Sequence, residues 1–229
     1  MKYVPVLDKG FRPMYAEFKK YSEEAAKTEN KLLKICVERN DGYNYIYEYK
    51  IFANGHKDEN NLMAERIVKT ILWLVGGYKI YLAGDENVYE FIKTAYTDKG
   101  IRAFDKNFME RVYEKPFEVI MCDEKNFPKE KKCSLSVGGH LDGCRIGFDA
   151  GGSDRKVSAV IDGKVVYSEE VVWFPKINSD PDYHYHEILT ALKTAASKMP
   201  RVDAIGVSSA GVYVNNKIMV ASLFLKVND

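Results

Sequence analysis

A short run of small residues behind an acid is where this sequence offers the clearest chemistry. Asp149 is followed by Ala150 and then by Gly151, Gly152 and Ser153. Paired glycines carry no Cβ atoms, so their backbone N–H groups can approach an anion closely. A carboxylate at the end of a strand can hold magnesium, the usual companion of phosphates, directly or through water. The run therefore predicts a phosphate-binding turn.

The residues after the turn add one acid and one base. We include both among the candidate phosphate- or nucleotide-binding residues, which are Asp149, Gly151, Gly152, Ser153, Asp154 and Lys156. Asp149 is the candidate metal ligand, for magnesium held through water.

Three strands must position this turn. The apolar run from Arg145 to Phe148 predicts a buried strand that ends at Asp149. Two further runs, 157–161 and 164–169, flank Asp162 and Gly163, and an Asp-Gly pair between apolar runs is a strong hairpin signal because both residues tolerate positive φ.

A helix and a parallel strand follow. Asp182 can cap a helix that runs to about Lys198, and Pro200 ends it. The strand 202–207 then returns beside the first one, in the right-handed sense expected of such crossovers. A turn at 208–211 and a hairpin about Asn215-Asn216 come next.

This part of the chain, residues 143–224, resembles the opening of a ROK-family protein. These are sugar kinases and repressors of the actin-like, sugar-kinase and Hsp70 ATPase superfamily. Their usual opening is Asp-x-Gly-Gly-Thr-Lys, which Asp149-Ala-Gly-Gly-Ser-Asp154 follows with Ser for Thr and Asp for Lys. Their later strand ends in Gly-x-x-x-x-Gly, which residues 206–211 match.

The resemblance implies a ribonuclease-H-like α/β fold, a mixed sheet with flanking helices. It implies ATP and magnesium as cofactors, and a nucleotide or a sugar as the partner. Asp149 would then orient Mg²⁺ through water, and the sugar pocket would include Ser208, Ser209 and Gly211.

A kinase of this family also needs a general base that takes the proton of the sugar hydroxyl. The family's Asp lies in an Asn-Asp motif after a further strand and helix, whereas Asn228-Asp229 follows the 212–220 hairpin directly. The family's His/Cys zinc motif is missing from the sequence, so we expect no zinc. We expect the phosphate-binding half without the catalytic half, in a piece of a longer protein. The purified chain should therefore not phosphorylate hexoses; if it did, Asp180, Asp182 and Glu187 would be the bases to examine.

Two other functions stay open. One is the ATPase component that activates 2-hydroxyacyl-CoA dehydratases, which also opens with Asp-x-Gly-Ser, although the paired glycines and residues 206–211 favour the ROK family. The other is a non-catalytic sugar or nucleotide sensor, in which Asp154 marks the loss of a catalytic phosphate site.

The N-terminal part reads as a smaller α/β domain of unclear role. We place it at residues 1–128 and consider that it is a second ribonuclease-H-like unit. Residues 129–142, which are charged and then Ser/Gly-rich, form the expected linker. Residues 143–229 form the ROK-like domain, which we expect to be incomplete. The expected helices of the N-terminal domain are 14–28, 59–74 with Asp58 as cap, 86–96 and a short one within 99–112, and its expected strands are 31–37, 43–52, 79–83 and 117–121.

Two N-terminal features leave alternatives open. Alternating tyrosines from Tyr43 to Tyr49 share one strand face, where they could stack on a ligand or simply cover the sheet. Gly84-Asp85 stands between a strand and a helix, where backbone amides can meet a nucleotide or form an ordinary turn.

Composition excludes several partners. With 34 Lys and Arg against 33 Asp and Glu, bulk charge indicates neither nucleic acid nor a membrane surface as partner. No apolar run reaches the ~18 residues of a membrane span, and the N-terminus lacks a signal-peptide core, so we expect a cytoplasmic protein. The four cysteines form no CxxC pair, which gives no support for a zinc or redox motif.

The apolar strand expected at 218–223 generates a prediction about assembly. Its two faces and its unpaired edge should be buried by association, because exposed apolar patches and free strand edges favour pairing. We expect a homodimer or higher oligomer with residues 212–225 or the neighbouring sheet face in the contact. Light scattering on the purified chain measures this, and a clean monomer at high micromolar concentration would contradict it.

Overall fold

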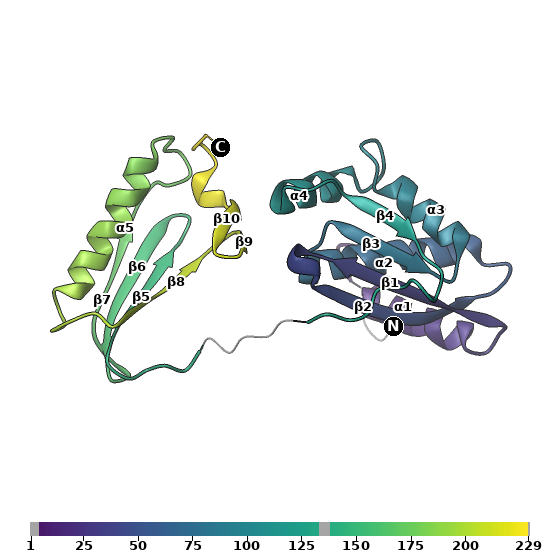
Figure 1. Ribbon diagram of the computed structural model, residues 1–229, viewed down its shortest axis with the longest axis horizontal. Helices are drawn as coiled ribbons and strands as arrows, with labels where there is room; N and C mark the ends of the chain where they lie inside the picture. Colours follow the sequence, from purple (N-terminus) through teal and green to yellow (C-terminus); the bar gives the residue numbers. More distant parts are fainter. Residues whose placement is uncertain (1–4, 133–137, 229) are drawn as a thin grey trace. The chain divides into compact units, whose positions relative to one another are not determined.

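The computed structural model describes residues 5–132 and 138–228. The chain divides into two compact units, Met1–Ser134 and Leu135–Asp229, and each is an α/β assembly with its own sheet (Figure 1). None of the helices in these ranges is long and apolar enough to cross a membrane.

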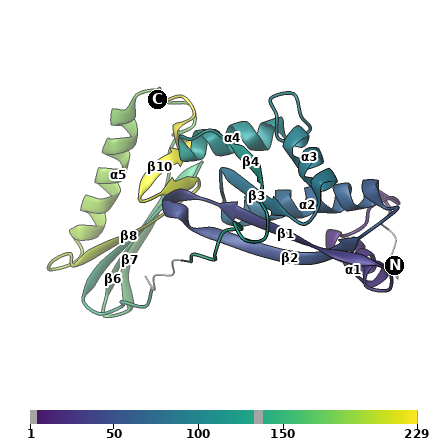
Figure 2. The same ribbon diagram turned by 45° about the vertical axis from the view of Figure 1, so that its right-hand side comes forward.

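The N-terminal unit is built on a four-stranded sheet of order β2-β1-β3-β4. Strand β1 is antiparallel to both β2 and β3, and β3 is parallel to β4. Figure 2 shows β1 and β2 side by side along their length. The elements are α1 (Met14–Ala25), β1 (Asn30–Glu38), a 3-10 turn (Asn40–Gly42), β2 (Asn44–Phe52), α2 (Lys57–Val75), β3 (Lys79–Ala83), α3 (Glu86–Ala95), α4 (Ala103–Tyr113) and β4 (Glu118–Met121).

One face of this sheet holds the core. Side chains alternate between faces, so Leu33, Ile35 and Val37 of β1 point the same way, and all three are fully buried. The alternating tyrosines of β2 join them: Tyr49 packs edge-on against Phe18 of α1 at 5.6 Å between ring centroids, and Tyr47 lies 6.3 Å from the same ring. The tyrosines therefore cover the sheet under α1.

The two helix starts after β2 and β3 differ from each other. Helix α2 begins at Lys57, two residues before the expected start, so Asp58 lies inside the first turn and His56 is the N-cap, without a side-chain capping bond. Helix α3 begins as expected, and Asp85 caps it by accepting from Val88 N at 2.8 Å. The Asp85 carboxylate already accepts a first-turn N–H of α3, and its negative charge would repel an anion bound there. The start of α3 is therefore an ordinary capped turn.

The C-terminal unit contains a four-stranded sheet of order β7-β6-β5-β8. Strands β5, β6 and β7 form an antiparallel meander, and α5 then leads to β8, which is parallel to β5. Asp162 and Gly163, with φ of 48° and 79°, make the predicted hairpin between β6 and β7. The elements are β5 (Cys144–Ala150), β6 (Asp154–Ile161), β7 (Lys164–Val172), α5 (Pro181–Ala196), β8 (Ala204–Ser209), β9 (Val212–Val214), β10 (Lys217–Val220) and a 3-10 turn (Ser222–Phe224).

Helix α5 covers one face of this sheet (Figure 1). Ile146, Phe148 and Val157 on the sheet meet Ala191 and Ala195 of α5 in a common core. The alanines let the helix approach the sheet closely. The intervening residues of β5, among them Gly147 and Asp149, point to the opposite face.

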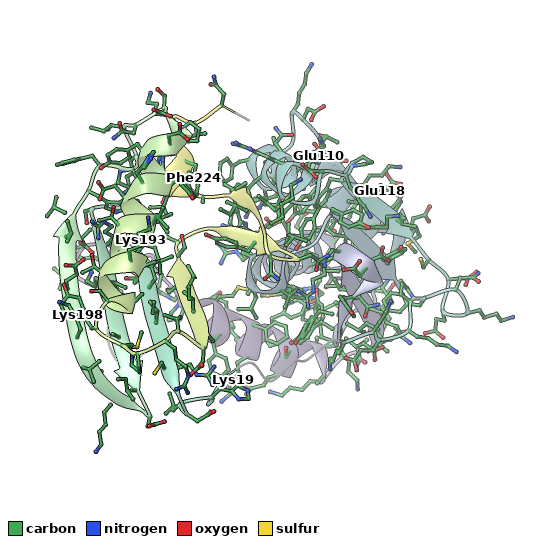
Figure 3. All side chains as sticks on the ribbon, turned by 60° about the vertical axis from the view of Figure 1, so that its left-hand side comes forward. Lys19, Glu110, Glu118, Lys193, Lys198 and Phe224 are labelled. Atoms are coloured by element: carbon green, nitrogen blue, oxygen red, sulfur yellow. The ribbon has the colours of Figure 1, made fainter. Side chains whose placement is uncertain are left out.

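The end of the chain corrects the sequence-based expectation. The strand expected to continue to Leu223 stops at Val220, and the 3-10 turn follows. Leu223 is only 1% exposed, and its carbonyl lies 3.0 Å from His184 Nε2 at the start of α5. The Phe224 ring stands 4.9 Å from the His184 ring, and Figure 3 marks Phe224 beside α5. Part of the apolar surface assigned to association is thus covered within the unit, while Ile218 remains 44% exposed.

The two units do not share a topology. In the C-terminal unit, three antiparallel strands precede α5, and the strand after this helix, β8, pairs parallel with β5. In the N-terminal unit, only the β1–β2 hairpin precedes α2, and the strand after this helix, β3, pairs antiparallel with β1. The N-terminal unit is therefore no copy of the C-terminal one. The first residues of the linker expected at 129–142 belong to the N-terminal unit, because Lys131 N donates to Asn44 Oδ1 and Asn44 N donates to Lys131 O.

Gly84 provides a test of this packing. Its φ is +109°, and a Cβ there would collide with the carbonyl oxygen of Leu32 on the neighbouring strand. Gly84→Ala should lower the free energy of unfolding of the N-terminal unit by roughly 3 kcal/mol, from backbone strain and overpacking together. Urea denaturation, with hydrogen exchange at β1 and β3 amides to identify the unit, measures the loss.

Gly55→Ala is the matched control for that variant. Gly55 also has a positive φ, +78°, but a Cβ would meet nothing within 4 Å. Only the cost of the left-handed conformation, about 1–2 kcal/mol, should appear. Equal losses in the two variants would mean that the contact with Leu32 has no effect.

Candidate functional site

The predicted site residues come together at one end of β5. Asp149 lies in register with Ser208 on the parallel strand β8 and with Lys156 on the antiparallel strand β6. Neighbours in register point to the same face, so all three side chains stand on the face opposite α5. In open α/β sheets, ligands bind outside the carboxyl ends of parallel strands, and Asp149 and Ser208 occupy those ends.

Two glycines create space on that face. Gly147 and Gly206 are in register at the centre of the β5–β8 pair, so no side chain covers the backbone there. A methyl group on Gly147 would lie 2.8 Å from Ser158 Oγ. The result is an open depression of about 490 Å³, lined by Gly147, Phe148, Asp149, Lys156, Val157, Ser158, Ser168, Gly206, Val207 and Ser208.

The turn beside the depression is held from behind by one tryptophan. Trp173 donates from Nε1 to Gly151 O at 2.8 Å and from its backbone N to Ser153 O at 3.2 Å. Both bonds use carbonyl oxygens, so they do not occupy the N–H groups that a phosphate would need. Ala150 belongs to β5, where it pairs with Arg155, and the turn is therefore one residue shorter than predicted.

Lys176 is a member of the site that sequence reasoning missed. A methyl group on Gly152 would lie 2.6 Å from Lys176 Nζ, so this ammonium stands directly against the paired glycines. Lys176 comes from the connection between β7 and α5. No motif marks it in the sequence, because its position depends on the chain path after Trp173.

The charges next to the turn are paired with each other. Asp154 accepts from Ser153 Oγ at 3.0 Å and forms a very short contact with the Lys156 ammonium. The hydrogen bond from Lys156, and then that from Ser153, lowers the pKa of Asp154, and the same bond to Asp154 raises the pKa of Lys156. Lys156 also lies 3.8 Å from Glu170. Lys176 differs from Lys156 in this respect, because it forms no ion pair with a carboxylate among residues 138–228.

The proposed sugar-pocket residues divide between the two faces. Ser208 lines the depression. Ser209 is one residue further along β8 and points to the α5 side, where its buried Oγ has no hydrogen-bond partner. Gly211 has a φ of +151° and packs against β10 and the residue after it, since a Cβ there would lie 2.8 Å from Ala221 Cβ. Ser209 and Gly211 therefore do not line the depression.

Two of the acids considered as catalytic bases are occupied elsewhere. Glu187 accepts from Arg155 Nε at 2.8 Å, and Arg155 is a buried side chain on the α5 face. Asp180 caps α5 by accepting from Asp182 N at 2.9 Å. Neither carboxylate is free to act on a ligand above Asp149.

A magnesium ion fits this site only together with a phosphate. Within 5–132 and 138–228, no three His, Cys, Asp or Glu side chains gather closely enough to hold a metal by themselves. Asp149 offers one half-buried carboxylate, and Mg²⁺ is usually bound by one or two carboxylates, substrate phosphates and water. The donor set therefore agrees with magnesium that arrives with its ligand.

No protein-family model matches the chain, and a search of curated proteins finds no match either. What this end of the sheet can do thus follows from its own groups: the glycine turn with Lys176 against it, the serine hydroxyls of the depression, and the charged side chains of Asp149, Asp154 and Lys156.

Trp173→Phe tests how the turn is held. The phenyl ring keeps most of the buried apolar contact but leaves Gly151 O without its indole donor. We expect the C-terminal unit to lose about 1–3 kcal/mol, the cost of an unsatisfied buried carbonyl, and the amides of residues 151–154 to exchange faster. Trp73→Phe is the control, because it removes an indole bond to Asp105 in the other unit. Unchanged exchange at 151–154 in Trp173→Phe would show that the indole does not shape the turn.

Proposed function

We propose that the C-terminal unit binds the phosphate groups of a nucleotide or a sugar, with ATP and magnesium as the expected pair, as a ROK-like module. The observation that carries the proposal is the placement of Lys176 against Gly152. The glycine turn and an ammonium without an ion-pair partner among residues 138–228 then meet, and the carboxylate of Asp149 stands at the end of the strand that leads into this turn. Each of these groups has a distinct use for a phosphate.

The roles follow from the chemistry of each group. The amides of Gly151 and Gly152 and the hydroxyl of Ser153 donate to phosphate oxygens, and Lys176 supplies the positive charge. Asp149 orients the waters of Mg²⁺, which neutralises phosphate charge when it is bound. Ser208 and Ser168, in the depression beside Asp149, offer hydroxyls to the part of the ligand beyond the phosphates.

The strand order supports a ribonuclease-H-like fold for this unit. An antiparallel meander, a helix and a strand that returns parallel to the first are all present, in the order β7-β6-β5-β8. This is the arrangement implied by the resemblance to the ROK family. The ROK family has a lysine after the glycine turn, where this chain has Asp154. Lys176 brings a cation to the same turn from the connection between β7 and α5, which compensates for the missing lysine.

A sensor is the second candidate, and the pairing of Asp154 favours it. Ser153 and Lys156 both donate to this carboxylate. A phosphate must therefore compete with an internal anion for two of its donors, which suits reversible binding better than transfer chemistry. Two of the acids considered as catalytic bases are also engaged: Glu187 accepts from Arg155, and Asp180 accepts from Asp182 N at the start of α5.

The binding test uses the full chain and amide chemical shifts. Magnesium-ATP should perturb residues 151–154 before any others in the C-terminal unit, and Asp149→Ala should remove the magnesium dependence. Lys176→Gln should weaken binding by about tenfold, the loss of one charge-assisted hydrogen bond.

Two exposed residues of the same unit serve as controls. Asp142→Ala removes another carboxylate, and Lys193→Gln removes another ammonium, on α5 (Figure 3). Neither should change the titration. An ATP titration that keeps its magnesium dependence in Asp149→Ala would defeat the assignment.

Asp154→Asn separates a sensor from a kinase-like site. It frees Lys156 and Ser153, so phosphate binding should tighten by severalfold, because a competing anion is removed. Hexose phosphorylation should stay at background in this variant. Turnover that appears on removal of Asp154 would instead indicate a kinase held inactive by that residue.

A further inference from the structure

The sequence contains a single Asn-Gly pair, Asn54-Gly55. The pair lies in the short loop between β2 and α2, outside any helix or strand, and both residues are exposed. An asparagine side chain can be attacked by the backbone nitrogen of the next residue. Glycine permits this attack best, because it has no Cβ to hinder the approach. No function assigned above uses these two residues.

The backbone nitrogen of Gly55 is free to react. Its N–H donates to no residue in the described part of the chain, whereas its neighbour Ala53 donates to Glu29 O at 3.0 Å. Gly55 has a φ of +78°, and a Cβ built on it would meet nothing within 4 Å. The nucleophile is therefore neither held by a hydrogen bond nor crowded by other groups.

The side-chain amide of Asn54 has one exposed partner. Its Nδ2 donates to Glu29 Oε2 at 3.1 Å, and Glu29 is itself exposed. A bond of this kind is easily exchanged for water. Asn60 shows the contrast, because it is 5% exposed, its Nδ2 donates to Phe52 O at 2.9 Å and its Oδ1 accepts from Tyr21 OH at 2.6 Å.

We propose that Asn54 is a site of spontaneous covalent modification, namely deamidation to aspartate and isoaspartate. Gly55 N loses its proton to water and bonds to Asn54 Cγ. The bond from Cγ to Nδ2 breaks, and the amide leaves as ammonia with a proton from water. Water then opens the five-membered imide at either carbonyl, so that one opening gives aspartate and the other gives isoaspartate. The net change is one water consumed and one ammonia released.

The modification should loosen the loop. Both products place a carboxylate where Asn54 now donates to Glu29, and two like charges at that distance repel each other. Glu29 also accepts from Ala53 N through its carbonyl, so separation would weaken this backbone bond. Isoaspartate in addition lengthens the main chain by one carbon, next to His56, whose ring stacks on Phe52 at 3.9 Å between centroids.

The first experiment follows the full chain during incubation at neutral pH and physiological temperature. Tryptic peptide 51–57 should gain one mass unit and separate into two products, aspartate and isoaspartate. Asn178, which precedes Ser179 and donates to Phe174 O at 2.7 Å, is the internal control in peptide 177–193. We expect conversion at Asn54 to be severalfold faster than at Asn178. Equal rates at the two asparagines would overturn the proposal.

The contribution of the fold is measured by repeating the incubation in urea. Because the Gly55 amide is free and the loop is exposed, the native rate at Asn54 should lie within about tenfold of the rate in the unfolded chain. Stronger protection in the native chain would mean that the fold shields this pair, and the proposal would fail.

Two variants identify the reacting groups. Gly55→Ala adds a methyl group beside the nucleophile and should slow conversion severalfold in native and unfolded chains alike. Asn54→Gln should abolish the mass gain in peptide 51–57, because a six-membered imide closes much more slowly. Neither variant should change the rate at Asn178. A mass gain in peptide 51–57 that persists in Asn54→Gln would place the modification at another residue.

The last experiment tests the consequence for the loop. Asn54→Asp reproduces the aspartate product, and hydrogen exchange at the Ala53 amide should become severalfold faster than in Asn54→Ala, which removes the donor without adding a charge. Adding Glu29→Gln to Asn54→Asp should restore slow exchange, since the new amide can donate to the new carboxylate. Equal exchange in Asn54→Asp and Asn54→Ala would contradict the proposed loosening by charge.

Discussion

Most of the C-terminal unit depends on how one indole is buried. Trp173 is 1% exposed, and its ring lies in the core between the sheet and α5. A buried N–H needs an acceptor, and the acceptor here is the Gly151 carbonyl of the turn. The requirement of a hydrophobic core thus fixes the backbone at the polar end of β5. The same anchor sets the path of the chain after β7, and that path brings Lys176 over Gly152.

The charges around the glycine turn of the C-terminal unit are mostly paired with one another. Lys156 contacts Asp154 and lies 3.8 Å from Glu170, and Ser153 Oγ donates to Asp154 at 3.0 Å. Lys176, which stands against Gly152, forms no ion pair among residues 138–228. This internal pairing limits the net charge that the turn presents to solvent.

Local signals predicted the strands and hairpins well, but they could not show what the chain brings together. Asp162-Gly163 and Asn215-Asn216 mark their turns because these residue types tolerate positive φ, which they indeed adopt. The exposed Lys176 has no such signature, because its position beside Gly152, 24 residues earlier in the sequence, depends on the tertiary fold. Asn60 and Asn61 look alike in sequence, and only the contacts of Tyr21 and Phe52 separate them. The antiparallel β1–β3 pairing and the buried Leu223 also depend on tertiary contacts that no short window contains.

The placement of the two tryptophans has a spectroscopic consequence. The sequence holds only these two, and one lies in each unit. Trp73 is 43% exposed and stacks on Phe104, whereas Trp173 is almost completely buried. Emission from a water-exposed indole lies at longer wavelength than emission from a buried one, so the native spectrum is a sum of two distinguishable components. The protein thus carries one intrinsic fluorophore for each unit, and the red and blue edges of a single emission band report on the two halves of the chain separately.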